Sequence, residues 1–186
     1  MRNKGLLLSV FGAMVVAQIA VPCWMIAQRE RTLREGRLYR FRTAPVDPYD
    51  AFRGKYVALR LEQGTLTNRY LNLSSGQKVF GALDEDTNGF ARIREVRPEA
   101  PSTGDYVKAR VRYAWEAQIV LDLPFDRYYM EETRAPSAER AYWQHSRRQT
   151  NDTWVAVRVR SGDAALEELF IAGRPIREFL REERTR

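Results

Sequence analysis

The sequence predicts a mainly β protein, with an N-terminal transmembrane helix followed by one β-sandwich or barrel-like domain that carries one or two short helices. Residues 5–27 form a long apolar run without a charged residue. After Gly36 the hydrophobic pattern changes to an alternation with a period of two, which is typical of strands with one buried face. Such segments recur as far as residue 171, and this density of short strands indicates a barrel or a sandwich.

The apolar run is long enough to cross a membrane. As a helix, residues 5–27 would measure about 35 Å, slightly more than the hydrocarbon core of a bilayer. The alternative is a cleaved signal sequence, which has a shorter apolar core and ends in small residues spaced as Ala-x-Ala. Neither Gln-Ile-Ala at 18–20 nor Met-Ile-Ala at 25–27 supplies that site. We therefore expect an uncleaved anchor, with residues 1–4 as a basic N-terminus and residues 28–36 as a juxtamembrane helix.

Two rules give opposite orientations for this anchor. The chain carries 31 Lys and Arg against 24 Asp and Glu, a net charge of +7, and arginines cluster just after the apolar run, from Arg29 to Arg42. Read literally, the positive-inside rule places this end, and the domain after it, in the cytoplasm. Long domains, however, are translocated largely regardless of charge, and a short basic start before a first apolar segment is typical of exported proteins. We expect residues 37–186 to form an exported β-rich domain, anchored in membrane lipid by the helix.

Short alternating segments predict the strands of this domain. They lie at residues 38–43, 56–61, 79–83, 90–96, 106–113, 118–123, 153–159 and 166–171. Pro136 suits a first helical turn and predicts a helix through residues 138–148, and residues 176–183 predict a short charged helix after a turn. Because no linker rich in Pro, Gly or Ser divides the soluble part, we expect one domain.

The composition excludes several classes of function. With one cysteine, Cys23, and one histidine, His145, the chain forms no internal disulfide and no zinc site built from Cys and His side chains. No serine or lysine near the anchor has an obvious catalytic partner, so we predict no catalytic residues and no cofactor. Arginines interleave with aromatic residues, but an anchored, exported domain argues against nucleic acid as a partner. Lipid phosphates are the simpler match for these arginines.

One segment formally matches a calcium-binding loop. Residues 84–95 satisfy the EF-hand pattern through its final glutamate, and the oxygen ligands would come from Asp84, Asp86, Asn88 and Glu95. The segments on either side are too short and too strand-like to be the helices of an EF-hand. Asn-Gly between two alternating runs is instead a strong signal for a hairpin turn. We expect a hairpin here, and keep calcium as the alternative.

Residues 44–59, Ala-Pro-Val-Asp-Pro-Tyr-Asp-Ala-Phe-Arg-Gly-Lys-Tyr-Val-Ala-Leu, closely resemble the signature of the GDYXXLXY family of bacterial proteins. The N-terminal membrane segment, the later hairpin and a Tyr-Tyr segment at 128–129 extend the resemblance over nearly the whole chain. Lys55 stands where the family has its aspartate, and Leu61 where it has its last tyrosine. The resemblance implies a single-pass protein of the bacterial inner membrane with a periplasmic domain, and it implies no reaction.

The same stretch offers either a structural turn or a binding pocket. Its prolines force extended or turn geometry, its carboxylates suit backbone capping, and its glycine permits a close approach. The functional alternative is a polar pocket lined by Asp47, Asp50, Arg53, Gly54 and Tyr56. We expect a non-enzymatic accessory or binding domain with a membrane-protein partner. The alternative is an envelope hydrolase or small-ligand-binding enzyme that uses this pocket.

Overall fold

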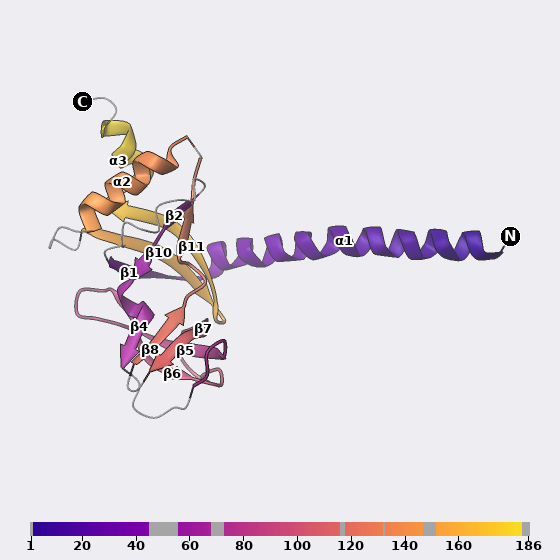
Figure 1. Cartoon of the computed structure of the whole chain (residues 1–186), viewed down its shortest axis with the longest axis horizontal. Helices are drawn as coiled ribbons and strands as arrows, with labels where there is room; N and C mark the ends of the chain where they lie inside the picture. Colours follow the sequence, from indigo (N-terminus) through magenta and orange to yellow (C-terminus); the bar gives the residue numbers. More distant parts are fainter. Residues whose placement is uncertain are drawn as a thin grey trace.

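The structure, a computed structural model, describes residues 2–44, 56–67, 73–115, 118–131, 133–146 and 152–183. A long helix projects from a β-rich body that carries two short helices at the end near the C-terminus (Figure 1). The strands are arranged as a nearly closed, barrel-like structure. The mainly β fold class predicted from the sequence is therefore confirmed.

The projecting helix α1 spans Arg2–Glu35 and contains Pro22 within it. At 1.5 Å per residue it is about 50 Å long. Its segment Lys4–Glu35 is long and apolar enough to cross a membrane, and the most apolar part of that segment is not buried by the rest of the protein. Large apolar side chains such as Leu8 and Ile26 are 76% and 69% exposed, an arrangement that a bilayer would cover.

The first sheet follows the helix directly and is antiparallel, with the order β12-β11-β10-β1-β3. Its strands are β1 (Arg37–Ala44), β3 (Arg60–Leu61), β10 (Thr153–Arg160), β11 (Asp163–Ile171) and β12 (Arg174–Pro175). Burial alternates along β1, where Tyr39, Phe41 and Thr43 point into the core and the arginines between them point outward. The period of two in the sequence thus reflects one buried face.

The second sheet has the order β4-β8-β7-β5-β6 and is also antiparallel. Its strands are β4 (Thr65–Thr67), β5 (Lys78–Glu85), β6 (Ala91–Arg97), β7 (Tyr106–Trp115) and β8 (Gln118–Asp122). A separate pair joins β2 (Tyr56–Ala58) to β9 (Arg127–Tyr129). A bridge between Val107 of β7 and Gly162, in the turn between β10 and β11, connects the two large sheets.

One continuous hydrophobic core fills the space between the sheets. Phe41 of the first sheet packs against Phe125, which follows β8, with ring centroids 4.9 Å apart. Helix α2 (Ala135–Ser146) contributes Ala138 and Tyr142 to this core, and α3 (Ile176–Glu183) contributes Ile176. The buried face of each helix thus completes the core that the strands begin.

Most predicted elements agree with the observed ones, but the strand predicted at 56–61 is divided into β2 and β3, which belong to different sheets. The helix predicted at 138–148 starts earlier, at Ala135, and β11 starts at Asp163 rather than 166. Strands β4, β9 and β12 were not predicted, since each contains only two or three residues. A run this short contains too few residues to display an alternating pattern.

Candidate functional site

Of the predicted binding pocket, only Tyr56 falls within the described residues. Asp47, Asp50, Arg53 and Gly54 fall outside the described residues. Tyr56, the fifth predicted residue, is the first residue of β2, where its backbone pairs with β9. The structure therefore leaves this pocket a prediction.

Next to Tyr56, a hydrogen-bonded group joins β9, β11 and α3. The buried Tyr128 donates its hydroxyl proton to Glu168 Oε1 at 2.5 Å, and Arg177 Nε donates to the same hydroxyl oxygen at 3.3 Å. Burial, and then the bond to Glu168, raise the pKa of Tyr128 to about 12. Tyr128 therefore stays protonated near neutral pH and acts as a donor that ties three elements together, rather than as a base. The sequence did not reveal this group, because its members are far apart in the chain.

The residues of the calcium-loop pattern form the β5–β6 hairpin that the sequence predicts. Asp86 Oδ1 accepts hydrogen bonds from the backbone N–H groups of Asn88, at 2.8 Å, and Phe90, at 2.9 Å. Gly89 has a positive φ of 74°, which a residue with a side chain rarely adopts. Asp86 thus caps a tight turn, and the chain needs Gly89 to complete it.

Each carboxylate of the calcium-loop pattern is paired with an arginine. Asp84 accepts from Arg92 at 2.8 Å, Asp86 from Arg42 at 2.7 Å, and Glu95 from Arg97 at 2.8 Å. These bonds, and for Asp86 chiefly the backbone bond from Phe90, hold the pKa of all three carboxyls below its ordinary value. Within the described residues, no group of three or more His, Cys, Asp or Glu side chains is placed to hold a metal ion. The calcium site stays a prediction.

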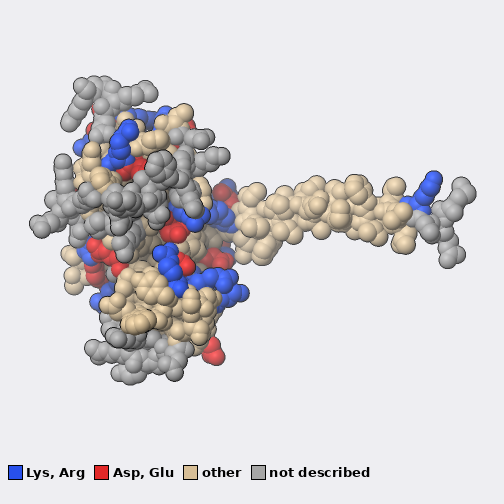
Figure 2. All heavy atoms as spheres, in the orientation of Figure 1, with Lys and Arg blue, Asp and Glu red and all other residues tan. Residues whose placement is uncertain are grey.

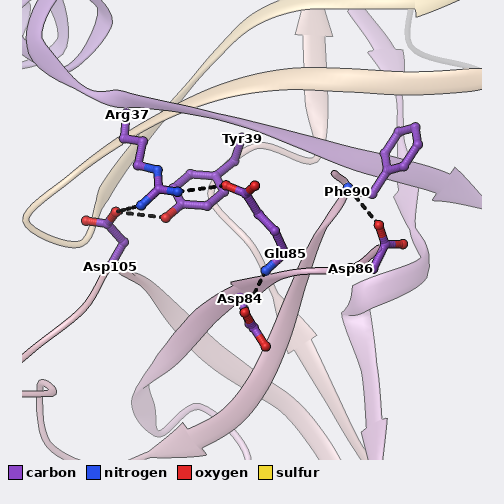
Figure 3. A network of polar contacts seen from close by, with 7 residues as sticks. All are labelled: Arg37, Tyr39, Asp84, Glu85, Asp86, Phe90 and Asp105. Carbon is purple, nitrogen blue, oxygen red and sulfur yellow. Dashed lines mark hydrogen bonds and ion pairs between the residues drawn. The ribbon is translucent and has the colours of Figure 1, made fainter. Parts of the chain in front are cut away.

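The first residues of β1 connect the end of α1 to this hairpin. Arg37 pairs with Glu85 at 2.9 Å and with Asp105 at 3.5 Å, and its guanidinium lies over the Tyr39 ring, 5.1 Å from the centroid (Figure 3). The Tyr39 hydroxyl donates to Asp105 at 2.7 Å. Burial, followed by the bond to Asp105, raises the pKa of Tyr39. The start of β1 is therefore fixed to both β5 and the entry of β7.

A stack of aromatic rings continues this connection across the first sheet. The Arg42 guanidinium lies 4.2 Å from the Phe90 ring centroid, and Phe90 meets Trp154 edge to face. Trp154 in turn stacks on Phe170, with centroids 3.9 Å apart and an interplanar angle of 3°. Each contact is of a kind that adds to simple area burial. The outer face of the sheet and the hairpin are thus held as one unit.

The junction between α1 and the domain is a single residue, Gly36, clamped by the β10–β11 hairpin. Arg158 donates to the Gly36 carbonyl at 3.2 Å, and Arg160 pairs with Glu35 at 3.0 Å. Thr32, in the last turns of the helix, is 4% exposed. Basic and acidic side chains gather where the helix enters the body, whereas the rest of the helix is almost uncharged (Figure 2). The helix therefore passes into the domain through one residue, and side chains of the β10–β11 hairpin contact both sides of that junction.

A second surface is apolar and exposed. Tyr113 and Trp115, at the end of β7, are 53% and 73% exposed and alternate onto the same side of the strand. Large aromatic side chains of this kind are the residues that most often dominate protein–protein interfaces. This pair is called the aromatic edge below.

The single histidine of the sequence lies between two helices. His145 lies on α2 with its ring edge to face on Phe179 of α3, 5.2 Å between centroids. This contact is a packing contact between two helices.

Comparison with known proteins identifies one family. The family model described as GDYXXLXY protein matches residues 18–169, from within α1 to the second half of β11. No curated protein and no solved structure matches the chain.

Proposed function

The chain belongs to the GDYXXLXY family, and from that premise we propose that it is a single-span protein of the bacterial inner membrane whose periplasmic, non-enzymatic domain binds another membrane protein. The match begins at residue 18, so it includes the second half of α1 and the end of the apolar run. An accessory domain of this kind acts by being held next to its partner, because tethering replaces free diffusion by a high local concentration.

The observation that carries the proposal is the clamped junction. A flexible linker would let the domain sample many heights and directions above the membrane. Here Arg158 donates a hydrogen bond to Gly36 and Arg160 pairs with Glu35, so that α1 continues into β1 with no linker between them. A domain with fixed height and direction presents the same surface to every neighbour in the membrane, which favours a partner that is itself a membrane protein.

The aromatic edge is the surface that we assign to this partner. Trp115 is the most exposed aromatic residue among the described strands, and its neighbour Tyr113 adds ring surface on the same side. Burying two such rings in a complex would supply the central contacts that typically account for most of the binding energy.

Site-specific crosslinking tests the proposal. A photo-reactive phenylalanine analogue is placed at Trp115, at Tyr113 or, as a control, at the exposed Arg94 of β6, and the full-length protein is irradiated in its native membrane. We expect the same membrane protein in adducts from both edge positions and from neither the control nor unirradiated cells. Trp115→Ser should reduce the adduct formed at Tyr113. Equal adducts at Arg94, or none at the edge, would refute the assignment.

A further inference from the structure

A groove of about 550 Å³ lies over β5, β7 and the end of β8 in the second sheet. This volume is in the range of sites for small organic ligands. Because side chains alternate along strands, the buried residues beneath it point into the core and every second residue faces the groove. The facing residues are Lys78, Phe80, Lys108, Arg110, Asp122 and Pro124.

Two of the cations in the groove face each other without an anion between them. Lys78 and Arg110 are directly opposite in the register of β5 and β7. Like charges in opposite positions of neighbouring strands destabilise a sheet. Within the described part of the chain neither has an ion pair, and Arg110 makes only a long hydrogen bond, 3.5 Å, to the Gly76 carbonyl. The fold thus keeps an unfavourable pair at the surface.

The acidic residue opposite Arg110 in the sheet is already paired with another arginine. Asp122 lies across from Arg110 on β8, but its carboxylate accepts two hydrogen bonds from Arg112, at 2.6 Å to Nε and 2.5 Å to Nη2. The third cation of the groove, Lys108, is paired with Asp163 at 2.7 Å. The positive charge of Lys78 and Arg110 is therefore left for a ligand.

The groove is apolar beside these cations. Phe80 is half-buried and packs edge to face on Tyr106, with centroids 5.7 Å apart, so its ring is held in place. Pro124 is exposed at the end of β8. A bound anion that carries an apolar part would match both the cations and the apolar surface of the groove. Its charged group would contact Lys78 and Arg110, and its apolar part would cover Phe80 and Pro124.

We propose that this groove binds an organic anion, a phosphate or carboxylate group attached to an apolar body, with Lys78 and Arg110 holding the charge and Phe80 holding the apolar part. The anion comes either from the headgroup of an anionic lipid or from a soluble compound, and the chemistry of recognition is the same. The inference does not depend on the proposed membrane-protein partner, because the groove and the aromatic edge share no residue.

The test uses the full-length chain in nanodiscs of phosphatidylcholine at about 0.15 M salt, where long-range attraction is screened. Phenyl phosphate is titrated by calorimetry, with inorganic phosphate and phenol as probes that carry only the charge or only the ring. We expect phenyl phosphate to bind at least about tenfold more tightly than either. Empty nanodiscs provide the blank, and no saturable binding of phenyl phosphate would overturn the proposal.

Two double variants distinguish binding in the groove from a general effect of positive charge on the protein. The double variant Lys78→Gln with Arg110→Gln should lower the affinity for phenyl phosphate about tenfold or more. The control, Arg92→Gln with Arg94→Gln, removes two cations from β6 of the same sheet and should change that affinity by no more than about twofold. Equal weakening by both pairs would overturn the site. The groove variant should unfold at the same or a higher temperature, because it removes a like-charge pair.

A second arm identifies the source of the anion. Nanodiscs that contain phosphatidylglycerol replace those of phosphatidylcholine. If the lipid headgroup fills the groove, phenyl phosphate should bind more weakly to the wild-type protein, and crosslinking of a photo-reactive phosphatidylglycerol should be lost in the groove variant. If phenyl phosphate binds equally in both lipids and still requires Lys78 and Arg110, the groove takes a soluble anion.

Discussion

The Tyr39 hydroxyl donates a hydrogen bond of 2.7 Å to the carboxylate of Asp105, and this bond joins the first strand after α1 to the entry of β7. The two residues are 66 positions apart, and both also interact with Arg37. This contact therefore connects the strand that follows α1 with the second sheet.

Tyr39→Phe should destabilise the domain by about 1 kcal/mol, since it removes one hydrogen bond and keeps the buried ring. The pH dependence follows from the raised pKa of Tyr39. Above its ordinary value of 10.0 the unfolded chain loses the proton while the folded chain keeps it, so the tyrosine's contribution to stability is present below pH 10 and lost as the pH rises. The difference in unfolding free energy between wild type and variant should narrow above pH 10 in denaturant titrations. A difference that grows there would contradict the assignment.

Gly36→Ala should weaken the junction between helix and domain. A Cβ atom at this position would lie 2.4 Å from the backbone oxygen of Thr32 and 3.1 Å from the backbone nitrogen of Val159, and neither atom can turn aside. We expect a loss of about 1–3 kcal/mol in thermal or denaturant unfolding of the full-length protein. Gly64→Ala is the control, because its nearest atom would be 3.8 Å away. Equal effects of the two substitutions would show that the junction tolerates a side chain.

Asp86→Ala should destabilise the β5–β6 hairpin more than Asp84→Ala. Asp86 accepts two backbone bonds of the turn and pairs with Arg42, whereas Asp84 accepts one backbone bond and pairs with Arg92 within the hairpin itself. Because the pKa of Asp86 is lowered, its contribution is present above the ordinary value of 3.8 and lost as the pH falls below it. Melting curves between pH 7 and pH 3 should therefore converge for wild type and Asp86→Ala in acid.

Calcium should leave the melting temperature of the purified protein unchanged. Each carboxylate of the calcium-loop pattern already pairs with an arginine, and Glu95 lies within β6, several residues beyond the turn. A cation would have to displace these arginines before it could bind. The measurement is thermal unfolding with millimolar calcium and with a chelator. A calcium-dependent rise in melting temperature that is lost in Asp86→Ala would favour the calcium alternative.

The domain should be labelled from outside the cell's inner membrane. In a Cys23→Ser background, a single cysteine at the exposed Ser102 should react with a membrane-impermeant maleimide in cells whose outer membrane has been opened. Intact inner membranes keep the reagent out of the cytoplasm, so labelling reports export. A site that reacts only after the inner membrane is lysed would place the domain in the cytoplasm, as the positive-inside rule read literally requires.

The long elements were predictable from the sequence because their patterns are local. The apolar run of α1 and the alternating burial of β1 and β7 each repeat over several residues, so the period identifies the element. Strand β9, with three residues, has no such repeat, and only its pairing with β2 makes it a strand. Short strands are a product of tertiary structure, and a local pattern does not contain them.

The candidate sites were less predictable for the same reason. Asp84, Asp86, Asn88 and Glu95 are close in sequence and match a motif, yet their positions follow from a hairpin with arginines supplied by β1 and β6. The opposed pair Lys78 and Arg110 depends on the register of two strands 32 positions apart, and residue spacing alone does not give that register. A sequence search finds neighbours along the chain, whereas these groups are neighbours across a sheet.

The direct passage from α1 to β1 at Gly36 implies that, in the proposed membrane setting, the thickness of the bilayer would affect the orientation of the domain. A transmembrane helix changes its tilt when the thickness of the surrounding lipid changes, and tilts of about 20° are ordinary. Because α1 passes into β1 through Gly36 and the β10–β11 hairpin contacts that junction, the proposed membrane helix would carry the β body with it when it tilts. Thinner or thicker lipid would then re-aim Trp115 without altering a single contact inside the fold.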